Sequence, residues 1–219
     1  MKNILITVFV MLYACSGFSQ DIESIEKGDK KSIELLDRLT LKTEAHKTIQ
    51  VEFTYKMINE EANINESTAG KLLVMGNKYR LNIAGQDVIS DGETSWTYIE
   101  DAGEVQINTV EDSEEAITPN KLLSSYNESF RSKFIKEGFQ YGTPVNVIDL
   151  TPVEGKSYYK VRLVIDKEKD QLLEITIFDK NGSTYSYIIN KFLPNVDVNP
   201  DIFSFKASDF PDADVIDMR

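Results

Sequence analysis

The segment Ser90-Asp91-Gly92-Glu93-Thr94-Ser95-Trp96-Thr97-Tyr98 decides the fold class of this chain. Asp-Gly between two apolar runs predicts a β-hairpin, because both residue types tolerate a positive φ and let two strands reverse in two residues. In the returning strand Trp96 and Tyr98 lie two residues apart and therefore share one face. We expect this aromatic pair to lie on the dry face of a sheet.

The same alternation of apolar and polar residues recurs along the chain and predicts further strands with one dry and one wet face. The apolar members of four such segments are Val51, Phe53, Tyr55 and Met57; Tyr79, Leu81 and Ile83; Tyr159, Val161, Leu163 and Ile165; and Leu173, Ile175 and Ile177. Gly76-Asn77 and Asn181-Gly182 are spaced as hairpin turns between strands. The pattern predicts a mainly β (α+β) protein, whose curved antiparallel sheet of about 11 strands forms an unclosed β-barrel.

Two amphipathic helices are expected beside the strands. Ser32 can cap a helix over residues 32–47, in which Ile33, Leu36 and Leu39 form an apolar stripe. Thr118-Pro119 can begin a second, short helix that runs to about Ser129 and carries Leu122, Leu123 and Tyr126 at helical spacing. We expect both helices to cover the apolar face of the sheet, since an uncovered face of that size promotes aggregation.

The N-terminus predicts export. Lys2 precedes an apolar run, residues 4–14, that is too short to span a bilayer, and small residues before Gln20 suit cleavage of a signal peptide, residues 1–19. A polar lead-in, residues 20–31, would then precede a single domain, residues 32–219. We expect a periplasmic protein. The alternative is a lipoprotein tethered to a membrane through an acylated Cys15, although Tyr13 fits a lipobox badly.

Composition excludes several classes of function. The formal net charge is -12 for 219 residues, and removal of residues 1–19, which contain one Lys and no acid, changes it to -13. A chain this acidic repels phosphate-rich partners, so nucleic acid is not expected. Cys15 is the only cysteine, which excludes an intramolecular disulfide and a thiolate metal site.

The catalytic inventory is small. His46 is the only histidine, and its neighbours Glu44 and Lys47 suggest a helix end at the surface rather than a catalytic base. Asp179 begins a segment that starts like a calcium loop, but the segment lacks the closing glutamate and is better explained as a turn. We therefore expect a protein that is not an enzyme and that has no catalytic residues, no metal and no cofactor, with a hydrolase using scattered carboxylates as a remote alternative.

Three blocks of sequence resemble the LolA family of periplasmic lipoprotein carriers. The first is the helix of residues 32–39 followed by the strand of residues 49–57, the second is the Ser-Asp-Gly hairpin with its Trp-x-Tyr, and the third is Ile202-Phe203-Ser204-Phe205 with Val215-Ile216-Asp217 after it. The resemblance implies an unclosed barrel with a helical lid. It also implies a monomer whose cavity takes the acyl chains of lipoproteins, received from an inner-membrane ABC transporter and delivered to an outer-membrane acceptor.

The resemblance also suggests residues for the cavity and the lid. The predicted cavity lining is Val51, Phe53, Tyr55, Leu73, Tyr79, Leu81, Trp96 and Tyr98, and the predicted lid residues are Leu122, Leu123 and Tyr126. The chain departs from the family at one point. Members of the family commonly carry an arginine before a Pro-Asn pair that holds the lid closed, whereas this chain reads Met75-Gly76-Asn77. Arg80 is near in sequence, but its alternation places it opposite Tyr79.

Two further expectations concern the lid and the tryptophan. The lid of this protein would be held by burial of apolar side chains rather than by an arginine, and acyl-chain binding would change the emission of Trp96. A different class of function on the same fold is a sensor that reads lipid or mislocalised lipoprotein and signals to a protein partner.

Overall fold

The computed structural model describes residues 28–110, residue 126 and residues 129–219. One α-helix precedes a long series of strands: α2 (Lys30–Glu44), β1 (Ile49–Asn59), β2 (Ile64–Met75), β3 (Lys78–Ile83), β4 (Gln86–Ser90), β5 (Thr94–Ile99), β6 (Glu104–Thr109), β7 (Phe130–Gln140), β8 (Thr143–Pro152), β9 (Tyr158–Asp166), β10 (Gln171–Asp179) and β11 (Thr184–Pro194). Two short 3-10 helices, η1 (Pro200–Phe203) and η2 (Ala207–Asp209), and strand β12 (Asp214–Asp217) follow. Within these residues, no helix is long and apolar enough to cross a membrane.

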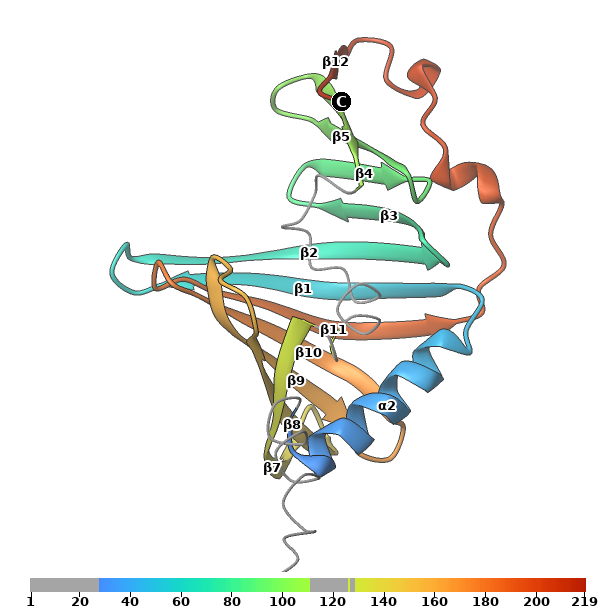
Figure 1. Ribbon diagram of the computed structural model, residues 1–219. Coiled ribbons are helices and arrows are strands. Elements are labelled where there is room, and N and C mark those ends of the chain that lie inside the picture. The colour runs from blue at the N-terminus through green and yellow to red at the C-terminus, as the bar shows by residue number, and fades with distance from the viewer. Residues whose placement is uncertain (1–27, 111–125, 127–128) are drawn as a thin grey trace, which may run out of the picture.

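All described strands belong to one twelve-stranded sheet in the order β12-β6-β5-β4-β3-β2-β1-β11-β10-β9-β8-β7. Neighbouring strands are antiparallel except β12, which pairs parallel with β6. The sheet is not closed, since β7 and β12 are its two ends, and Figure 1 shows β7–β9 turned steeply away from β1 and β2. The predicted unclosed, mainly β fold is confirmed, and the strand beyond the expected eleven is the short C-terminal β12.

Helix α2 begins two residues earlier than the sequence predicts. Asp29 caps it, because its Oδ1 accepts a hydrogen bond from the backbone N–H of Ser32 at 3.0 Å. The Ser32 hydroxyl donates instead to the Asp29 carbonyl and lies 2.8 Å from the hydroxyl of Ser132 in β7. The expectation that Ser32 is the cap is therefore wrong, because Asp29 has that role. The small, fully buried side chain of Ser32 instead fixes the helix against the sheet.

The hairpin turns lie where the sequence places them, with one difference in length. Gly76 and Asn77 alone join β2 to β3, and Gly76 has φ +58°. The loop between β4 and β5 has three residues, Asp91, Gly92 and Glu93, rather than two. Asp91 accounts for the extra residue, because its Oδ1 accepts from the backbone N–H groups of Glu93 and Thr94 at 2.9 and 2.8 Å.

The largest core lies between α2 and one half of the sheet. Leu35, Leu36 and Leu39 pack on apolar residues of β8, β9 and β10, including Ile148, Leu150, Val161, Leu163, Ile165 and Ile175. We call the sheet face that carries these residues the inner face and the opposite one the outer face. Figure 1 shows α2 lying obliquely across this half of the sheet.

Two irregularities in the sheet change the faces that alternation predicts. The ladder between β9 and β10 shifts register between Leu172 and Glu174 and again between Phe178 and Asp179. Leu173 consequently packs with Val145, Val147 and Val164 on the outer face, while Tyr159 is half exposed and its neighbour Tyr158 packs on the core. Alternation alone cannot locate such bulges.

Candidate functional site

The inner face continues beyond α2 as a second apolar surface, which we call the open half. Its buried members are Ile49, Val51, Phe53, Leu72 and Val74, and its partly buried members are Tyr55, Tyr79, Leu81, Ile83, Tyr187, Ile189 and Phe192. All twelve come from strands β1, β2, β3 and β11, and no described helix residue belongs to this cluster. The pairing of neighbouring strands aligns these residues in rows: Val51 lies opposite Leu72, and Leu72 lies opposite Leu81. The open half is therefore a continuous aliphatic and aromatic surface.

Phe53 is held flat on this surface by a glycine. Phe53 lies opposite Gly70 in the β1–β2 ladder, and a Cβ at Gly70 would lie only 2.3 Å from the Phe53 Cζ atom. Any side chain at position 70 would push the ring away from β2. The Phe53 ring also contacts the ring of Tyr187, with centroids 5.8 Å apart. Gly70 thus keeps the surface smooth at its centre.

Tyr187 and Ile189 join the two parts of the inner face. Both pack against the core under α2 and also against the open half. Tyr187 lies directly opposite Tyr55 in the β1–β11 ladder. Burial raises the pKa of Tyr187 to about 12, with smaller contributions from Tyr55 and Tyr185. The inner face is therefore apolar and poorly solvated at this junction.

Five of the eight predicted lining residues lie together on the open half: Val51, Phe53, Tyr55, Tyr79 and Leu81. The other three, Leu73, Trp96 and Tyr98, lie on the outer face. Leu73 pairs with Arg80, Arg80 with Ile89, and Ile89 with Trp96, all one residue out of phase with the inner row. The prediction that all eight line one cavity is wrong, because the sheet separates the two sets.

The outer-face aromatic residues pack against the C-terminal segment. Trp96 stacks on Phe205 with ring centroids 5.9 Å apart, and Tyr98 contacts Phe210 at 4.7 Å. Phe203 of η1 is fully buried, and η1 packs on β3 and β4. Figure 1 shows the chain after β11 running along the sheet to β12. Trp96 and Tyr98 do share a face, as the hairpin predicts, but on that face they pack against the C-terminal phenylalanines and remain only partly buried.

The predicted lid falls largely outside the described residues. Leu122 and Leu123 lie there. Tyr126 is described, is in helical conformation and is buried in the core with Leu35, Leu36 and Leu39. Its hydroxyl donates to Asp37 of α2 at 2.5 Å. Tyr126 thus connects the segment before β7 to the helix that covers the sheet.

Neither Met75 nor Arg80 lies on the inner face. Met75 pairs with Lys78 in the row of Leu73 and Arg80, on the outer face. Arg80 forms an ion pair with Asp87, with Nη2 and Oδ2 2.6 Å apart. As the alternation predicts, Arg80 is opposite Tyr79, so it cannot act as a latch over the open half.

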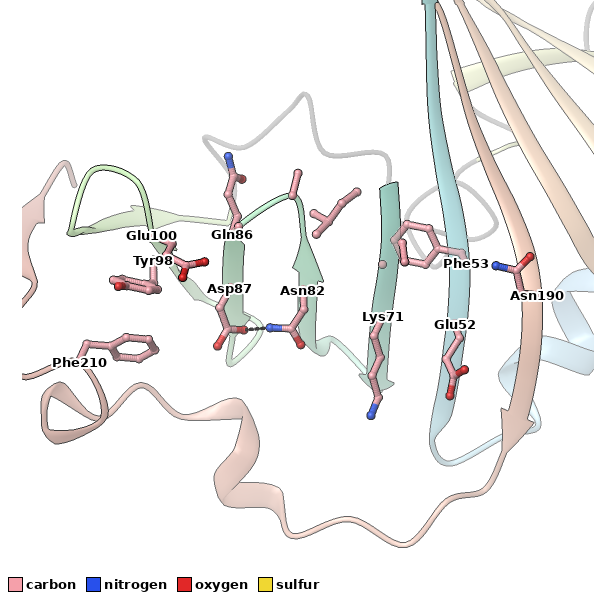
Figure 2. A pocket seen from close by; sticks show the side chains of 15 residues that line it. Glu52, Phe53, Lys71, Asn82, Gln86, Asp87, Tyr98, Glu100, Asn190 and Phe210 are labelled. Carbon is pink, nitrogen blue, oxygen red and sulfur yellow. Dashed lines mark hydrogen bonds between the residues drawn. The ribbon is translucent and has the colours of Figure 1, made fainter. Parts of the chain in front are cut away.

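A cleft of about 760 Å³ lies beside the open half. Its lining includes Glu52, Lys71, Asn82, Asp87, Gln86, Tyr98, Glu100, Asn190 and Phe210, together with Phe53 and Ile83 from the inner face. Figure 2 shows Glu52, Lys71 and Asp87 pointing toward the segment that carries Phe210. Four charged side chains, Glu52, Lys71, Asp87 and Glu100, line this cleft, so it suits acyl chains less well than the open half does.

The remaining sequence candidates have structural roles. His46 follows the end of α2 and its ring contacts Phe192 edge-on at 5.9 Å. Asp179 accepts a hydrogen bond from the backbone N–H of Asn181, which forms the predicted turn. Among residues 28–110, 126 and 129–219, no group of three or more His, Cys, Asp or Glu side chains could hold a metal ion.

Comparison with known proteins identifies the class. The model of the family described as outer membrane lipoprotein carrier protein LolA matches residues 44–206. The chain belongs to this LolA family, whose members are carrier or binding proteins rather than enzymes. No curated protein matches the chain by sequence at a significant level.

Three solved structures share the fold. An uncharacterized conserved protein from Thermus thermophilus has a TM-score of 0.60 at 12% identity, covering 86% of this chain and 99% of that one. The Mycobacterium tuberculosis lipoprotein LppX gives 0.51 at 14%, covering 79% and 100%. A DUF1329 family protein from Desulfovibrio piger gives 0.50 at 12%, covering 81% and 98%. At these identities the likeness extends to the fold alone.

Proposed function

We propose that the protein is an exported carrier that holds the acyl chains of a lipoprotein, or of another lipid, on the open half of the inner face. The observation that supports this proposal is the row of partly buried apolar residues on β1, β2, β3 and β11. These residues keep solvent contact at a place where the same face, a few strands away, is fully sealed by α2. Membership of the lipoprotein carrier family points to the same use of this surface.

The surface suits reversible binding of a flexible chain. Each acyl CH₂ removed from water contributes about 0.8 kcal/mol, so one long chain left in water costs on the order of ten kcal/mol. A carrier must offset most of this cost and still release its cargo. Area-proportional contact with Leu81, Ile83 and Phe192 has no directional requirement, which allows a chain to slide off again.

The wider pathway is proposed from the family. The carrier would receive its cargo from an inner-membrane ABC transporter and deliver it to an outer-membrane acceptor, as a periplasmic protein that begins at Gln20. The net charge of -13 that remains after removal of residues 1–19, which contain one Lys and no acid, would keep it from adhering to anionic membranes between the two steps. Mass spectrometry of the protein from a native periplasm would test the start at Gln20.

Ligand binding is tested with the purified mature protein. An environment-sensitive apolar dye should bind, a lipopeptide should displace it, and native mass spectrometry should find an acylated species in protein from periplasm. A folded protein that shows neither dye binding nor bound lipid would refute the proposal. Transfer of the lipopeptide to acceptor vesicles or to a candidate acceptor protein then separates a carrier, which releases its cargo, from a sensor, which retains it.

A further inference from the structure

Three tyrosines form a cluster at the junction of the two parts of the inner face. Tyr55 and Tyr187 are cross-strand partners whose ring centroids lie 5.2 Å apart, and Tyr185 stacks on Tyr55 at 6.5 Å. Tyr185 pairs with Met57, two residues from Tyr55, so all three side chains lie on the inner face. All three are partly buried. We call them the tyrosine cluster.

The hydroxyls of the tyrosine cluster have no acceptor within the described protein. None of the three makes a hydrogen bond with residues 28–110, 126 or 129–219. By contrast, the hydroxyl of Tyr126, in the core under α2, donates a hydrogen bond to Asp37. The cluster therefore presents donors that are not engaged elsewhere, next to the apolar residues of the open half.

Burial raises the pKa of Tyr55 and of Tyr187, which keeps these two donors neutral. The pKa of Tyr55 is raised mainly by burial, and to a smaller extent by electrostatic repulsion from Tyr185 and Glu66. Tyr55 and Tyr185 both raise the pKa of Tyr187, so the three hydroxyls lie within electrostatic range of one another. The same burial and the nearby Glu66 carboxylate disfavour a second negative charge at this place.

These properties define a ligand group. Neutral donors without acceptors match an oxygen that can only accept, and an ester or amide carbonyl is such a group. A free carboxylate also accepts, but it would bring a charge into a partly desolvated site beside Glu66. A plain hydrocarbon would leave the donors without partners.

We propose that Tyr55, Tyr185 and Tyr187 bind the carbonyl of a neutral ester or amide linkage, and that they fix the direction in which the acyl chain lies on the open half. The chain then extends from the tyrosine cluster toward Val51, Leu72 and Leu81, which continue the same face. The inference rests on the proposed carrier function and names its cargo class: acyl chains in neutral linkage, not free fatty acids.

The test compares three competitors of equal chain length, namely methyl laurate, laurate and dodecane, for displacement of the apolar dye. The wild-type protein should bind the ester most tightly. The Tyr55→Phe/Tyr185→Phe/Tyr187→Phe variant removes three hydroxyls and no apolar surface. Its ester affinity should fall by about tenfold to the level of dodecane, while dodecane binding stays unchanged. Tyr159→Phe, which removes the hydroxyl of a half-exposed tyrosine outside the cluster, is the matched control.

The outcomes separate this inference from the carrier proposal. Equal affinity of the wild type for ester and dodecane, or an unchanged ester affinity in the triple variant, would overturn the role of the tyrosine cluster and leave the carrier intact. Displacement by none of the three competitors would overturn both. If circular dichroism shows that the triple variant is unfolded, Tyr185→Phe alone should still weaken ester binding by about fivefold and not dodecane binding.

Discussion

The two parts of the inner face use similar residues for different ends. Under α2, Leu36, Leu163 and Ile165 have no solvent exposure. On the open half, Tyr79, Leu81 and Ile83 lie in an equally apolar row but remain partly exposed. The sheet is one continuous ladder through both regions. Cover by the helix, rather than composition, therefore distinguishes the sealed core from the surface that we propose for ligand binding.

The largest expected difference concerns stability. Leu36→Ala, in the covered part, should lower the free energy of unfolding by about 2 to 5 kcal/mol, because it leaves a cavity among fully buried side chains. Leu81→Ala, on the open half, should cost much less, since its side chain is only partly buried. Urea denaturation measures both values. Similar losses for the two variants would show that the open half is as well packed as the covered one.

Alkaline pH probes the junction between the two parts. Burial raises the pKa of Tyr187 from 10.0 to about 12, so the folded protein retains this proton in a window where the unfolded chain has lost it. The unfolding free energy should therefore fall as pH rises from 10.0 to about 12, by at most about 3 kcal/mol from this residue. Tyr187→Phe should remove that part of the loss, whereas Tyr159→Phe should not. Parallel curves for the wild type and Tyr187→Phe would contradict the burial.

The outer face should contribute to stability without affecting ligand binding. Arg80→Ala breaks the half-buried ion pair with Asp87 and should cost about 1 to 2 kcal/mol. Because Arg80 lies on the face opposite the open half, dye affinity of the folded variant should equal that of the wild type. Release of bound lipid by Arg80→Ala would mean that this residue does act as a latch.

The smallest expected effect is the absence of a signal from Trp96. It stacks on Phe205 behind the sheet, so acyl-chain binding should leave its emission unchanged. A Trp96→Phe/Leu81→Trp variant moves the fluorophore to the open half, and its emission should shift to the blue on ligand binding. If native Trp96 responds and the relocated tryptophan does not, the two faces have been assigned the wrong way round.

Much of the architecture could be predicted from the sequence. The Asp-Gly hairpin, the turn at Gly76-Asn77 and the alternation in β1 and β3 all correspond to the structure. Alternation tells which residues share a face, but it does not say which of two apolar faces a helix covers. For this reason the sequence pairs Trp96 with Tyr98 correctly but assigns the pair to the wrong side of the sheet.

The closing Phe-x-Phe contained the missing signal. A segment that carries Phe203, Phe205 and Phe210 must bury these rings somewhere, and in the structure Phe205 and Phe210 pack against Trp96 and Tyr98 on the outer face. The bulge that moves Leu173 to the outer face had no comparable sequence signal. Of the tyrosine cluster, the sequence predicted only Tyr55 as a lining residue. Tyr185 and Tyr187 are brought to it by the pairing of β1 with β11, and these two strands are far apart in the sequence.

The proposed binding surface is tested most directly by a single charge placed on either face of β3. Leu81 lies on the open half, whereas its neighbour Asn82 lies on the outer face between Lys71 and Asp87. Both Leu81→Glu and Asn82→Glu should fold, and dye titration should show that only Leu81→Glu loses binding. Equal binding by the two variants, or loss in Asn82→Glu alone, would contradict the claim that the open half of the inner face holds acyl chains.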